Sequence, residues 1–364
     1  MLKRRVTSYD VAKLAGVSRS TVSFVLNNVD MQISEETKER VRAAALHLGY
    51  VPDAAAQALV SRRSRIIGLI FTRARHHIDD DIFLTQVLDG LLQTTQRHTM
   101  RLMLDLVEET GSAATYLELI QSKRIDGLII SCPRTDNTAW RGLIDEGVPL
   151  VLMGQLPDPG PCYVDVDNAA AARTAVDHLV SLGHTRIACI TNAPLSYPAA
   201  LQRLEGYRSV LAANGIAYRD EWVRYGDFTL ESGYARMSSL LSESELPTAV
   251  FVASDVVAIG AMAAIRERGL RIPEDMAVVG FDDVPFARYA TPPLTTAHLP
   301  AAELGRRAGE MLIDLVNGRR PDEPHVLLDT HLVVRESCGA ALERSRTAAQ
   351  LAQDSKLVSD RQRG

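Results

Sequence analysis

Residues 11–28 read VAKLAGVSRSTVSFVLNN and carry the start and stop signals of two short helices. A first helix begins near Ser8, and Gly16 ends it because glycine readily adopts the left-handed conformation that closes a helix. Ser18 offers the hydroxyl of an N-cap for a second helix. The apolar side chains of each helix share one face, Val11, Leu14 and Ala15 on the first and Val22, Val25 and Leu26 on the second.

A third helix is expected at residues 35–48, capped by Ser34 and ended by Gly49, with an apolar face formed by Val41, Ala44, Ala45 and Leu48. Three short helices with a tight glycine turn predict an all-α helix-turn-helix head. Short hydroxyl side chains would let the second helix enter the major groove of DNA, where an arginine can read guanine. The alternative is a small helical subdomain with a solvated face. The second helix turns Arg19, Ser20, Ser23, Phe24 and Asn27 outward or to its margins.

Charge is unevenly distributed along the chain. Residues 1–63 hold ten basic and six acidic side chains, a net charge of +4, whereas the whole chain carries −5, which leaves −9 for the rest. A basic head on an acidic body favours a polyanionic partner for the head alone.

A short segment, residues 51–61, connects this head (1–50) to the rest of the chain. Pro52 breaks away from the third helix, and Asp53 can cap a new helix over Ala54 to Leu59. Two turns are too few for a stable isolated helix. We therefore expect a hinge helix that forms only when it docks on a partner.

From residue 62 to 340 apolar strands alternate with amphipathic helices, a pattern typical of parallel sheets covered on both faces. The strands are too many for one open sheet of ordinary size, so the expected fold is an α/β core of two doubly wound lobes. The expected lobes are residues 62–162 with 293–325, and 163–292 with 326–340. The polar tail, 341–364, is expected to be disordered.

The chain shows no signs of several other protein classes. Its four cysteines are far apart, which argues against a disulfide framework or zinc site and favours a reducing, cytoplasmic location. A signal peptide and a run long enough to span a bilayer are both missing. No dinucleotide, P-loop, nucleophile-elbow or HExxH motif nominates a reaction or a cofactor. We therefore expect neither an enzyme nor a membrane protein.

Five stretches together resemble the lactose/galactose repressor (LacI/GalR) family of bacterial transcription regulators, over residues 7 to about 340. They are VTSYDVAKLAGVSRSTVSFVLNN, RVRAAALHLGYVPDAAAQAL, DHLVSLGHTRIACI, RLEGYRSVL and VVGFDDVPFARYATPPLTT. The resemblance implies a homodimer with DNA-binding heads, hinge helices and a core like periplasmic sugar-binding proteins. Two-fold symmetry in turn implies a palindromic operator in double-stranded DNA.

The resemblance also implies which residues contact DNA. Residues 18–27 form the recognition helix, in which Arg19, Ser20 and Phe24 select the operator. Phe24 either touches a thymine methyl or packs back on the module. Leu59 wedges between base steps from the minor groove, or lies in the seam between two hinge helices. Contacts to phosphates or capping roles fall to Thr7, Ser18, Ser23 and Asn27.

Ligands of open α/β lobes lie beyond the carboxyl ends of the strands, which here places a small effector between the lobes. Those ends carry Thr72, Phe228, Ser254 with Asp255, and Asp282. The resemblance makes Arg203 and Asp282 partners of effector hydroxyls, Phe228 a stacking face and Phe83 a second wall. Each has an alternative: Asp255 only caps a helix, Arg203 and Asp282 form a salt bridge between the lobes, and Phe228 packs in a core.

The segment RARHHIDDD, residues 73–81, combines histidines with aspartates, but its spacing fits no regular metal site. We expect a solvated rim at the mouth of the cleft.

The combined expectation is a repressor of carbohydrate genes whose operator affinity is controlled by a sugar-like effector. A purine- or nucleoside-responsive regulator of the same architecture is the alternative. A sugar-binding protein related to transport is the rival from another class.

Overall fold

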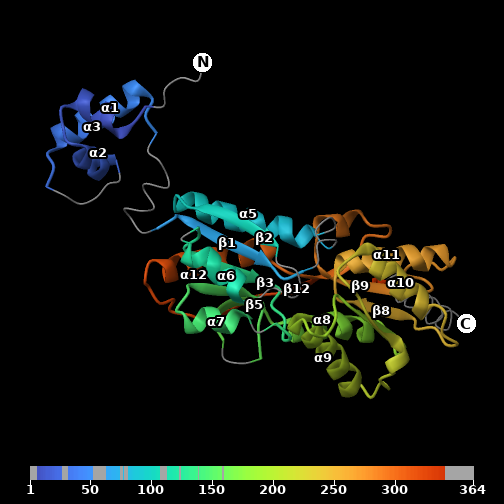
Figure 1. Ribbon diagram of the computed structural model, residues 1–364. Coiled ribbons are helices and arrows are strands. Elements are labelled where there is room, and N and C mark those ends of the chain that lie inside the picture. Colours follow the sequence, from blue (N-terminus) through green and yellow to red (C-terminus); the bar gives the residue numbers. More distant parts are fainter. Residues whose placement is uncertain are drawn as a thin grey trace, which may run out of the picture. The chain divides into compact units, whose positions relative to one another are not determined.

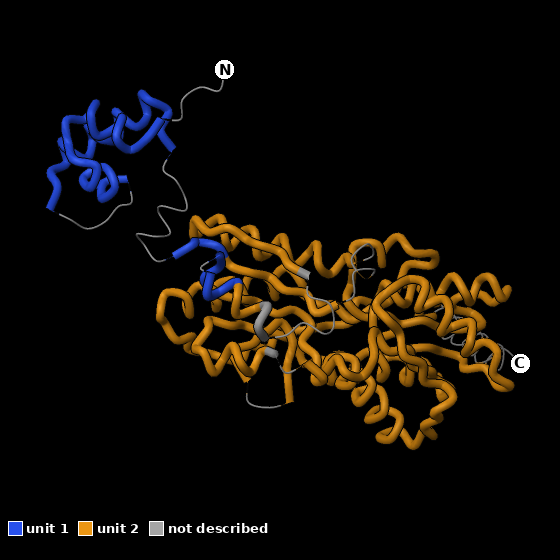
Figure 2. The backbone as a smooth tube through the Cα atoms, viewed as in Figure 1, with its two compact units in different colours: residues 1–66, 119–126 blue, residues 67–118, 127–364 orange. Residues whose placement is uncertain are grey.

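The structure is a computed structural model that describes residues 6–26, 32–51, 63–73, 77, 81–106, 113–122, 124–137, 139–157 and 160–340 (Figure 1). The chain divides into two compact units, residues 1–66 with 119–126, and residues 67–118 with 127–364 (Figure 2). The predicted hinge helix at 54–59 and the tail at 341–364 lie outside the described residues.

The head contains three helices, α1 (Ser8–Ala15), α2 (Arg19–Leu26) and α3 (Glu35–Leu48). Gly16 has a φ of 65° and ends α1 as predicted, and the next N–H, of Val17, donates to the carbonyl of Ala12 at 3.1 Å. Ser34 accepts from the backbone N–H of Thr37 to cap α3, and Gly49 with a φ of 61° ends it. The local capping chemistry therefore sets these boundaries.

The core of the head is built by small and β-branched side chains from all three helices. The prediction that Leu14 belongs to this core is wrong, because its side chain is 52% exposed. Successive residues advance by about 100° around a helix, so the buried face that includes Ala12 leaves Leu14 on the margin. The buried set is Val11, Ala12, Ala15, Val22, Val25, Val41, Ala44 and Ala45.

Lobe 1 is built on a sheet of six strands in the order β11-β5-β4-β3-β1-β2. The pairs from β11 to β1 are parallel. Helix α12 packs on α5 and over β3, β4 and β5. The elements are β1 (Ile66–Phe71), α5 (Ile82–Arg97), β2 (Arg101–Leu106), α6 (Ala113–Gln121), β3 (Gly127–Ser131), α7 (Ala139–Asp145), β4 (Leu150–Met153), β5 (Cys162–Val166), α12 (Ala301–Val316) and β11 (His325–Leu328).

Lobe 2 has a second six-stranded sheet in the order β12-β10-β9-β8-β6-β7, parallel except for the β10–β12 pair. Helices α8 and α9 pack together, as do α10 and α11 (Figure 1). The elements are α8 (Asn168–Ser181), β6 (Ile187–Thr191), α9 (Pro198–Ala213), η2 (Asp220–Trp222), β7 (Val223–Tyr225), α10 (Leu230–Leu240), β8 (Ala249–Val252), α11 (Asp255–Glu267), β9 (Ala277–Asp282), η3 (Pro285–Tyr289), β10 (Thr295–His298) and β12 (His331–Val333).

The predicted lobe boundaries are wrong in three places. Strand β5, assigned mostly to lobe 2, pairs with β4 in lobe 1, and β11 pairs with β5 in the same sheet. Strand β10, assigned to lobe 1, pairs with β9 in lobe 2. The chain therefore crosses between lobes after β5, after β10 and between β11 and β12. A short apolar strand fits either sheet, so its own sequence does not specify its partner.

Glycines bring the paired helices into close contact. A Cβ at Gly90 on α5 would lie 1.9 Å from the carbonyl oxygen of Ala302 on α12, and one at Gly233 on α10 would lie 2.0 Å from that of Val257 on α11. In each lobe, polar groups that can meet a ligand are expected at the carboxyl ends of the parallel strands. No helix among the described residues is long and apolar enough to cross a bilayer.

Candidate functional site

Helix α2 presents a polar surface at its start. Arg19 and Ser20 are exposed, and Ser23 and Phe24 are partly exposed. Ser18 caps the helix by accepting from the backbone N–H of Thr21 at 3.0 Å, and its hydroxyl also lies 2.6 Å from that of Ser20. The Phe24 side chain is not among those that form the buried core of the head. The helix can therefore show a cation, hydroxyls and part of an aromatic ring to a duplex.

Thr7 precedes α1 and is held by Asp10. The Asp10 carboxylate accepts from the Thr7 backbone N–H at 2.9 Å and from its hydroxyl at 2.7 Å. Of the other residues predicted to contact DNA, Asn27 and Leu59 lie outside the described part of the chain.

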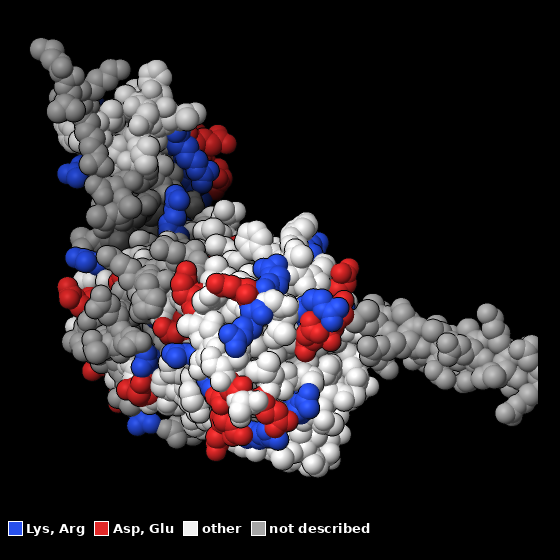
Figure 3. Space-filling model, turned by 90° about the vertical axis from the view of Figure 1, so that its right-hand side faces the viewer, with Lys and Arg blue, Asp and Glu red and all other residues white. Residues whose placement is uncertain are grey.

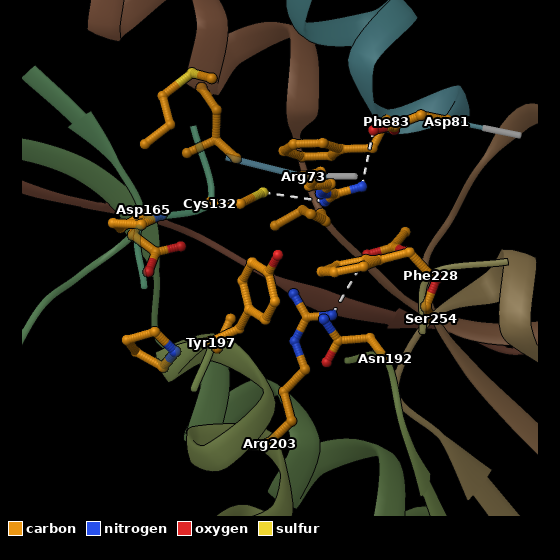
Figure 4. A pocket seen from close by; sticks show the side chains of 18 of the residues that line it. Arg73, Asp81, Phe83, Cys132, Asp165, Asn192, Tyr197, Arg203, Phe228 and Ser254 are labelled. Carbon is orange, nitrogen blue, oxygen red and sulfur yellow. Dashed lines mark hydrogen bonds and ion pairs between the residues drawn. The ribbon is translucent and has the colours of Figure 1, made fainter. Parts of the chain in front are cut away.

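A cavity of about 860 Å³, open mouth included, lies between the carboxyl ends of strands from both lobes (Figure 4). Lobe 1 contributes residues that follow β1, β3 and β4 and one residue within β5, Asp165, and lobe 2 contributes residues that follow β6, β7, β8 and β9. The polar and aromatic side chains on its wall are Arg73, Asp81, Phe83, Cys132, Gln155, Asp165, Asn192, Tyr197, Arg203, Phe228, Ser254 and Asp282.

Arg203 on α9 is buried and held rigidly. Its Nε donates to the Asn168 side-chain oxygen at 2.9 Å, and one terminal nitrogen donates to the Ala253 carbonyl at 2.7 Å. That nitrogen lies 3.6 Å from the Asp282 carboxylate, and the guanidinium stacks 3.6 Å above the Phe281 ring. Burial lowers the pKa of Arg203, and the nearby Asp282 opposes that shift.

Asp282 faces the cavity at the end of β9 and accepts from the Ser254 hydroxyl at 3.0 Å. Burial raises its pKa to about 6, although Arg203 pulls the other way. Asp255 lies behind it, fully buried, and accepts from the Val284 backbone N–H at 2.9 Å and from the Thr296 hydroxyl at 2.6 Å. Burial, and then the charge of Asp282, raise the pKa of Asp255. Asp255 and Asp282 thus lie together in a buried site, where loss of hydration disfavours the charged form of each carboxyl.

Arg73 extends from the end of β1 into the cavity (Figure 4). Its terminal nitrogens donate to Asp81 at 2.8 Å and to the Cys132 sulfur at 3.0 Å. The guanidinium also lies 3.7 Å above the Phe228 ring, which belongs to lobe 2. Burial is the strongest single influence on Arg73 and disfavours its charge, but Asp81, Cys132 and Tyr197 together raise the Arg73 pKa. Arg73 therefore joins the two lobes through an ion pair on one side and a cation–π contact on the other.

Hydrogen bonds also connect the lobes beside the cavity. The Tyr197 hydroxyl of lobe 2 donates to the Thr72 carbonyl of lobe 1 at 3.0 Å. The Thr135 backbone N–H of lobe 1 donates to the Ser196 carbonyl of lobe 2 at 2.9 Å. These bonds join lobe 1 to lobe 2 beside the cavity.

The prediction of a solvated rim at residues 73–81 is wrong for the residues described there. Arg73 is 8% exposed, His77 is 2% exposed, and the Asp81 side chain is buried by its ion pair with Arg73. The His77 Nε2 lies 3.1 Å from an Asp227 oxygen across the lobes. Long-range packing buries these three residues, and the polar composition of the segment did not indicate that. The described residues hold no cluster of His, Cys, Asp or Glu arranged for a metal ion.

The structure brings most of the predicted effector residues to one cavity, but not Thr72 or Asp255. The Thr72 hydroxyl donates to the Cys132 carbonyl at 2.5 Å, and Asp255 is enclosed by backbone and Thr296. Both are thus committed to internal hydrogen bonds. The predicted residues that do line the cavity are Phe83, Arg203, Phe228, Ser254 and Asp282.

Several lining residues were missed that the same reasoning could have found. Arg73, Cys132 and Asn192 each follow directly on a strand or one residue later, where polar groups gather in α/β lobes. The Asn192 side-chain oxygen and the Arg73 Nε are buried without a hydrogen-bond partner within the described residues. Gln155 likewise lies two residues beyond the end of β4. Asp165 lies within β5, and Asp81 and Tyr197 directly precede α5 and α9, where the sequence did not indicate an approach to the cavity.

On the face of lobe 2 seen in Figure 3, acidic and basic side chains are interspersed. Lobe 2 contains ion pairs such as Arg219–Glu245 and Arg224–Glu243. Interspersed charge gives this face no single-sign field that would attract a nucleic acid.

Comparison with known proteins places both parts of the chain. A family model described as "Bacterial regulatory proteins, lacI family" matches residues 7–53, and one described as "Periplasmic binding protein-like domain" matches residues 176–338. The chain is 36% identical to the HTH-type transcriptional regulator CelR of Thermobifida fusca, over 92% of this chain and 99% of that protein. It is 34% identical to the HTH-type transcriptional repressor CytR of Escherichia coli K12, over 92% and 96%.

Solved structures agree with these relatives. A CelR–cellobiose complex matches with a TM-score of 0.71 and 35% identity, over 92% of this chain and all of that one. The lac repressor dimer bound to operator and the anti-inducer ONPF matches with a TM-score of 0.80 and 33% identity, over 92% and 99%.

Proposed function

We propose that a neutral sugar in the interlobe cavity controls the operator affinity of this protein. The chain belongs to the lacI family of bacterial regulatory proteins and is a DNA-binding transcription regulator. Support comes from the cavity itself, which combines buried hydrogen-bonding groups with aromatic walls. That mixture suits a polyhydroxylated ring, whose hydroxyls need partners and whose CH face needs an apolar surface.

The charge balance of the cavity favours a neutral effector. Arg73 is paired with Asp81 at 2.8 Å, and Arg203 lies 3.6 Å from Asp282, so neither cation is left over. Asp165 adds a further carboxyl, whose pKa is raised by burial. A sugar acid or sugar phosphate would bring its negative charge beside these carboxylates, which costs free energy in a buried site.

The proposed contacts follow from geometry. Arg203 and Asp282 would serve adjacent hydroxyls with charge-assisted hydrogen bonds. Asn192 and the Arg73 Nε offer a buried acceptor and donor that a ligand could satisfy once the lobes rearrange. Phe83 supplies an aromatic wall. Phe228 is a weaker stacking platform than predicted, because Arg73 covers one face of its ring.

A nucleobase effector is the second candidate. CytR and a PurR repressor of Vibrio vulnificus are among the relatives, and the PurR protein is 32% identical over 91% of this chain. Aromatic rings at Phe83 and Phe228 are compatible with a flat base.

We further propose that the chain acts as a homodimer in the cytoplasm and reads a palindromic operator through α2. The dimer is supported by the lac repressor structure and by two aromatic side chains on η3 of lobe 2. Phe286 is 59% exposed and Tyr289 is 76% exposed. Large exposed aromatics of this kind are typical of interfaces. For DNA contact we propose Thr7, Ser18, Arg19, Ser20, Ser23 and Phe24, together with Asn27 and Leu59.

Two measurements test this function. Full-length protein is incubated with a library of random duplexes, and we expect a palindromic sequence to be enriched, with affinity that falls as salt rises. Melting temperature is then measured with neutral mono- and disaccharides, uronic acids, sugar phosphates and purines. A neutral sugar should raise it and should change affinity for the enriched duplex. Enrichment of no sequence would refute a DNA-binding regulator, and a response to charged sugars or purines alone would refute the neutral sugar.

A further inference from the structure

The place where the chain enters the core is held by one carboxylate. Asp126 Oδ1 accepts from the backbone N–H of Ser64 at 2.7 Å and from its hydroxyl at 2.9 Å. Asp126 Oδ2 accepts from the next backbone N–H, of Arg65, at 2.8 Å. Three donors from two consecutive residues thus converge on a single side chain. Such a carboxylate, 62 residues away in sequence, restrains both position and direction of the chain.

The backbone at this point has an unusual conformation that the contacts explain. Arg65 has a φ of 58°, in the left-handed region that non-glycine residues rarely adopt. The Asp126 backbone N–H also donates to the Ile66 carbonyl at 2.7 Å, so the two segments bond in both directions. A strained residue persists only where its surroundings over-determine it. The contacts with Asp126 therefore account for the backbone conformation of Arg65.

Asp126 lies next to the strand that leads from the entry of the core to the cavity. It directly precedes β3, and β3 pairs in parallel with β1 from Ile67 opposite Gly127 onward. Beyond the other end of β1, Arg73 stacks on Phe228 of lobe 2. A single buried strand of six residues therefore runs from the anchored end to the cavity wall. Residues 51–63, the linker, connect the head to Ser64 along the chain.

We propose that Asp126 is a positioning residue that fastens the linker to lobe 1, so that a movement of lobe 1 caused by effector reaches the DNA-binding head. This inference rests on the proposed function. Without the carboxylate, Ser64 and Arg65 lose their fixed direction and gain conformational freedom. Ordering that freedom on DNA then costs entropy, and a shift of lobe 1 is no longer passed on.

The oxygens of Asp126 allow graded variants. Asp126→Ala removes all three acceptor contacts. Asp126→Asn retains one oxygen for Ser64 but turns an N–H₂ group toward the Arg65 N–H, so it breaks fewer. Ser64→Ala removes the hydroxyl and leaves both backbone bonds. Asp145→Asn is the matched control. Asp145 is exposed on α7 of the same lobe, and its substitution removes the same charge as Asp126→Asn does.

Full-length variants are tested on the duplex that the wild-type protein enriches, with and without the sugar that raises the wild-type melting temperature. Asp126→Ala should bind this duplex about tenfold more weakly, and the ratio of affinities with and without sugar should fall toward one. Asp126→Asn should be intermediate and Asp145→Asn unchanged. The melting temperature of Asp126→Ala should fall modestly, because three hydrogen bonds are lost. Calorimetric sugar affinity should stay near wild type in all four variants, which general damage to lobe 1 would not allow.

Failure of this inference differs from failure of the proposed function. If the wild type enriches no duplex, the proposed function and the inference fail together. If the wild type does bind, and Asp126→Ala matches Asp145→Asn in affinity and in sugar response, Asp126 has no positioning role. A loss of sugar affinity equal to the loss of DNA affinity would also overturn it, since the damage would then extend to the cavity.

Discussion

Replacing Asp282 by Asn should stabilise the protein while weakening its response to effector. The Asp282 side chain is 12% exposed and lies 3.6 Å from Arg203. Its pKa is raised from 3.8 to about 6, chiefly by burial. The folded state therefore holds the Asp282 proton more tightly than the unfolded state does. Above pH 6 ionisation of Asp282 works against folding, and this penalty disappears as the pH falls toward 4.

The size of the effect follows from the shift in pKa. The difference between about 6 and 3.8 is roughly two units, and each unit corresponds to about 1.4 kcal/mol. An uncharged isostere should thus raise the free energy of unfolding by up to about 3 kcal/mol at neutral pH. Loss of repulsion on the buried Asp255 adds to the gain. A neutral side chain also leaves Arg203 with its bonds to Asn168 and Ala253.

Urea denaturation of the full-length wild type, Asp282→Asn and the exposed control Asp145→Asn measures this at about pH 7.5 and about pH 5. The advantage of Asp282→Asn should be largest at the higher pH and should shrink at the lower, whereas the control should follow the wild type at both. A variant less stable than wild type at pH 7.5, or an advantage independent of pH, would refute the reasoning.

The same substitution should weaken effector binding. A carboxylate accepting from a sugar hydroxyl contributes about 1.5–3 kcal/mol, so calorimetry should show at least tenfold weaker binding. Wild-type affinity should fall as the pH drops through about 6, because the carboxylate then gains a proton. Asp282→Asn should lack this dependence.

Three further predictions concern other parts of the molecule. Gly90→Ala places a Cβ 1.9 Å from the Ala302 carbonyl oxygen, so it should separate α5 from α12 and lower the unfolding free energy by about 2–3 kcal/mol in urea denaturation; an unchanged midpoint would contradict close helix packing. Tyr197→Phe loses the bond to the Thr72 carbonyl, worth about 1 kcal/mol, so small-angle scattering should show a more open core; a radius of gyration equal to wild type would exclude this bond as a clasp. Arg19→Ala should weaken operator binding by about 1–3 kcal/mol and leave sugar affinity intact; equal DNA affinity would remove Arg19 from the interface.

The head was predictable because its signals are local. Gly16, Ser34 and Gly49 set helix ends through bonds to residues within a turn of themselves, and the structure places each as expected. The alternation of strands and helices likewise predicted two α/β lobes, because burial on both faces of a parallel sheet requires runs of apolar residues. Family motifs then indicated Arg203 and Asp282, which the structure brings to the same cavity.

The misassigned strands show where local reasoning ends. Strands β5, β10 and β11 were given to the wrong lobes, because an apolar strand of four or five residues pairs equally well with either sheet until the chain crossings are known. Thr72 was assigned to the cavity from its place at a strand end, yet its hydroxyl is already used by the Cys132 carbonyl.

The amino-acid pattern alone was enough to predict the three helices of the head and the alternation of strands and helices in the core. It also showed that a basic head precedes an acidic core and which family the chain resembles. Each of these depends on neighbours within a few residues or on ordered motifs. Long-range packing was needed to bury Arg73 and His77, to set Arg73 against Phe228, and to bring Asp126 to Ser64 and Arg65. These contacts join residues far apart in the chain, and the free energy of burying a charged or polar group depends on partners that assemble only when the whole core closes.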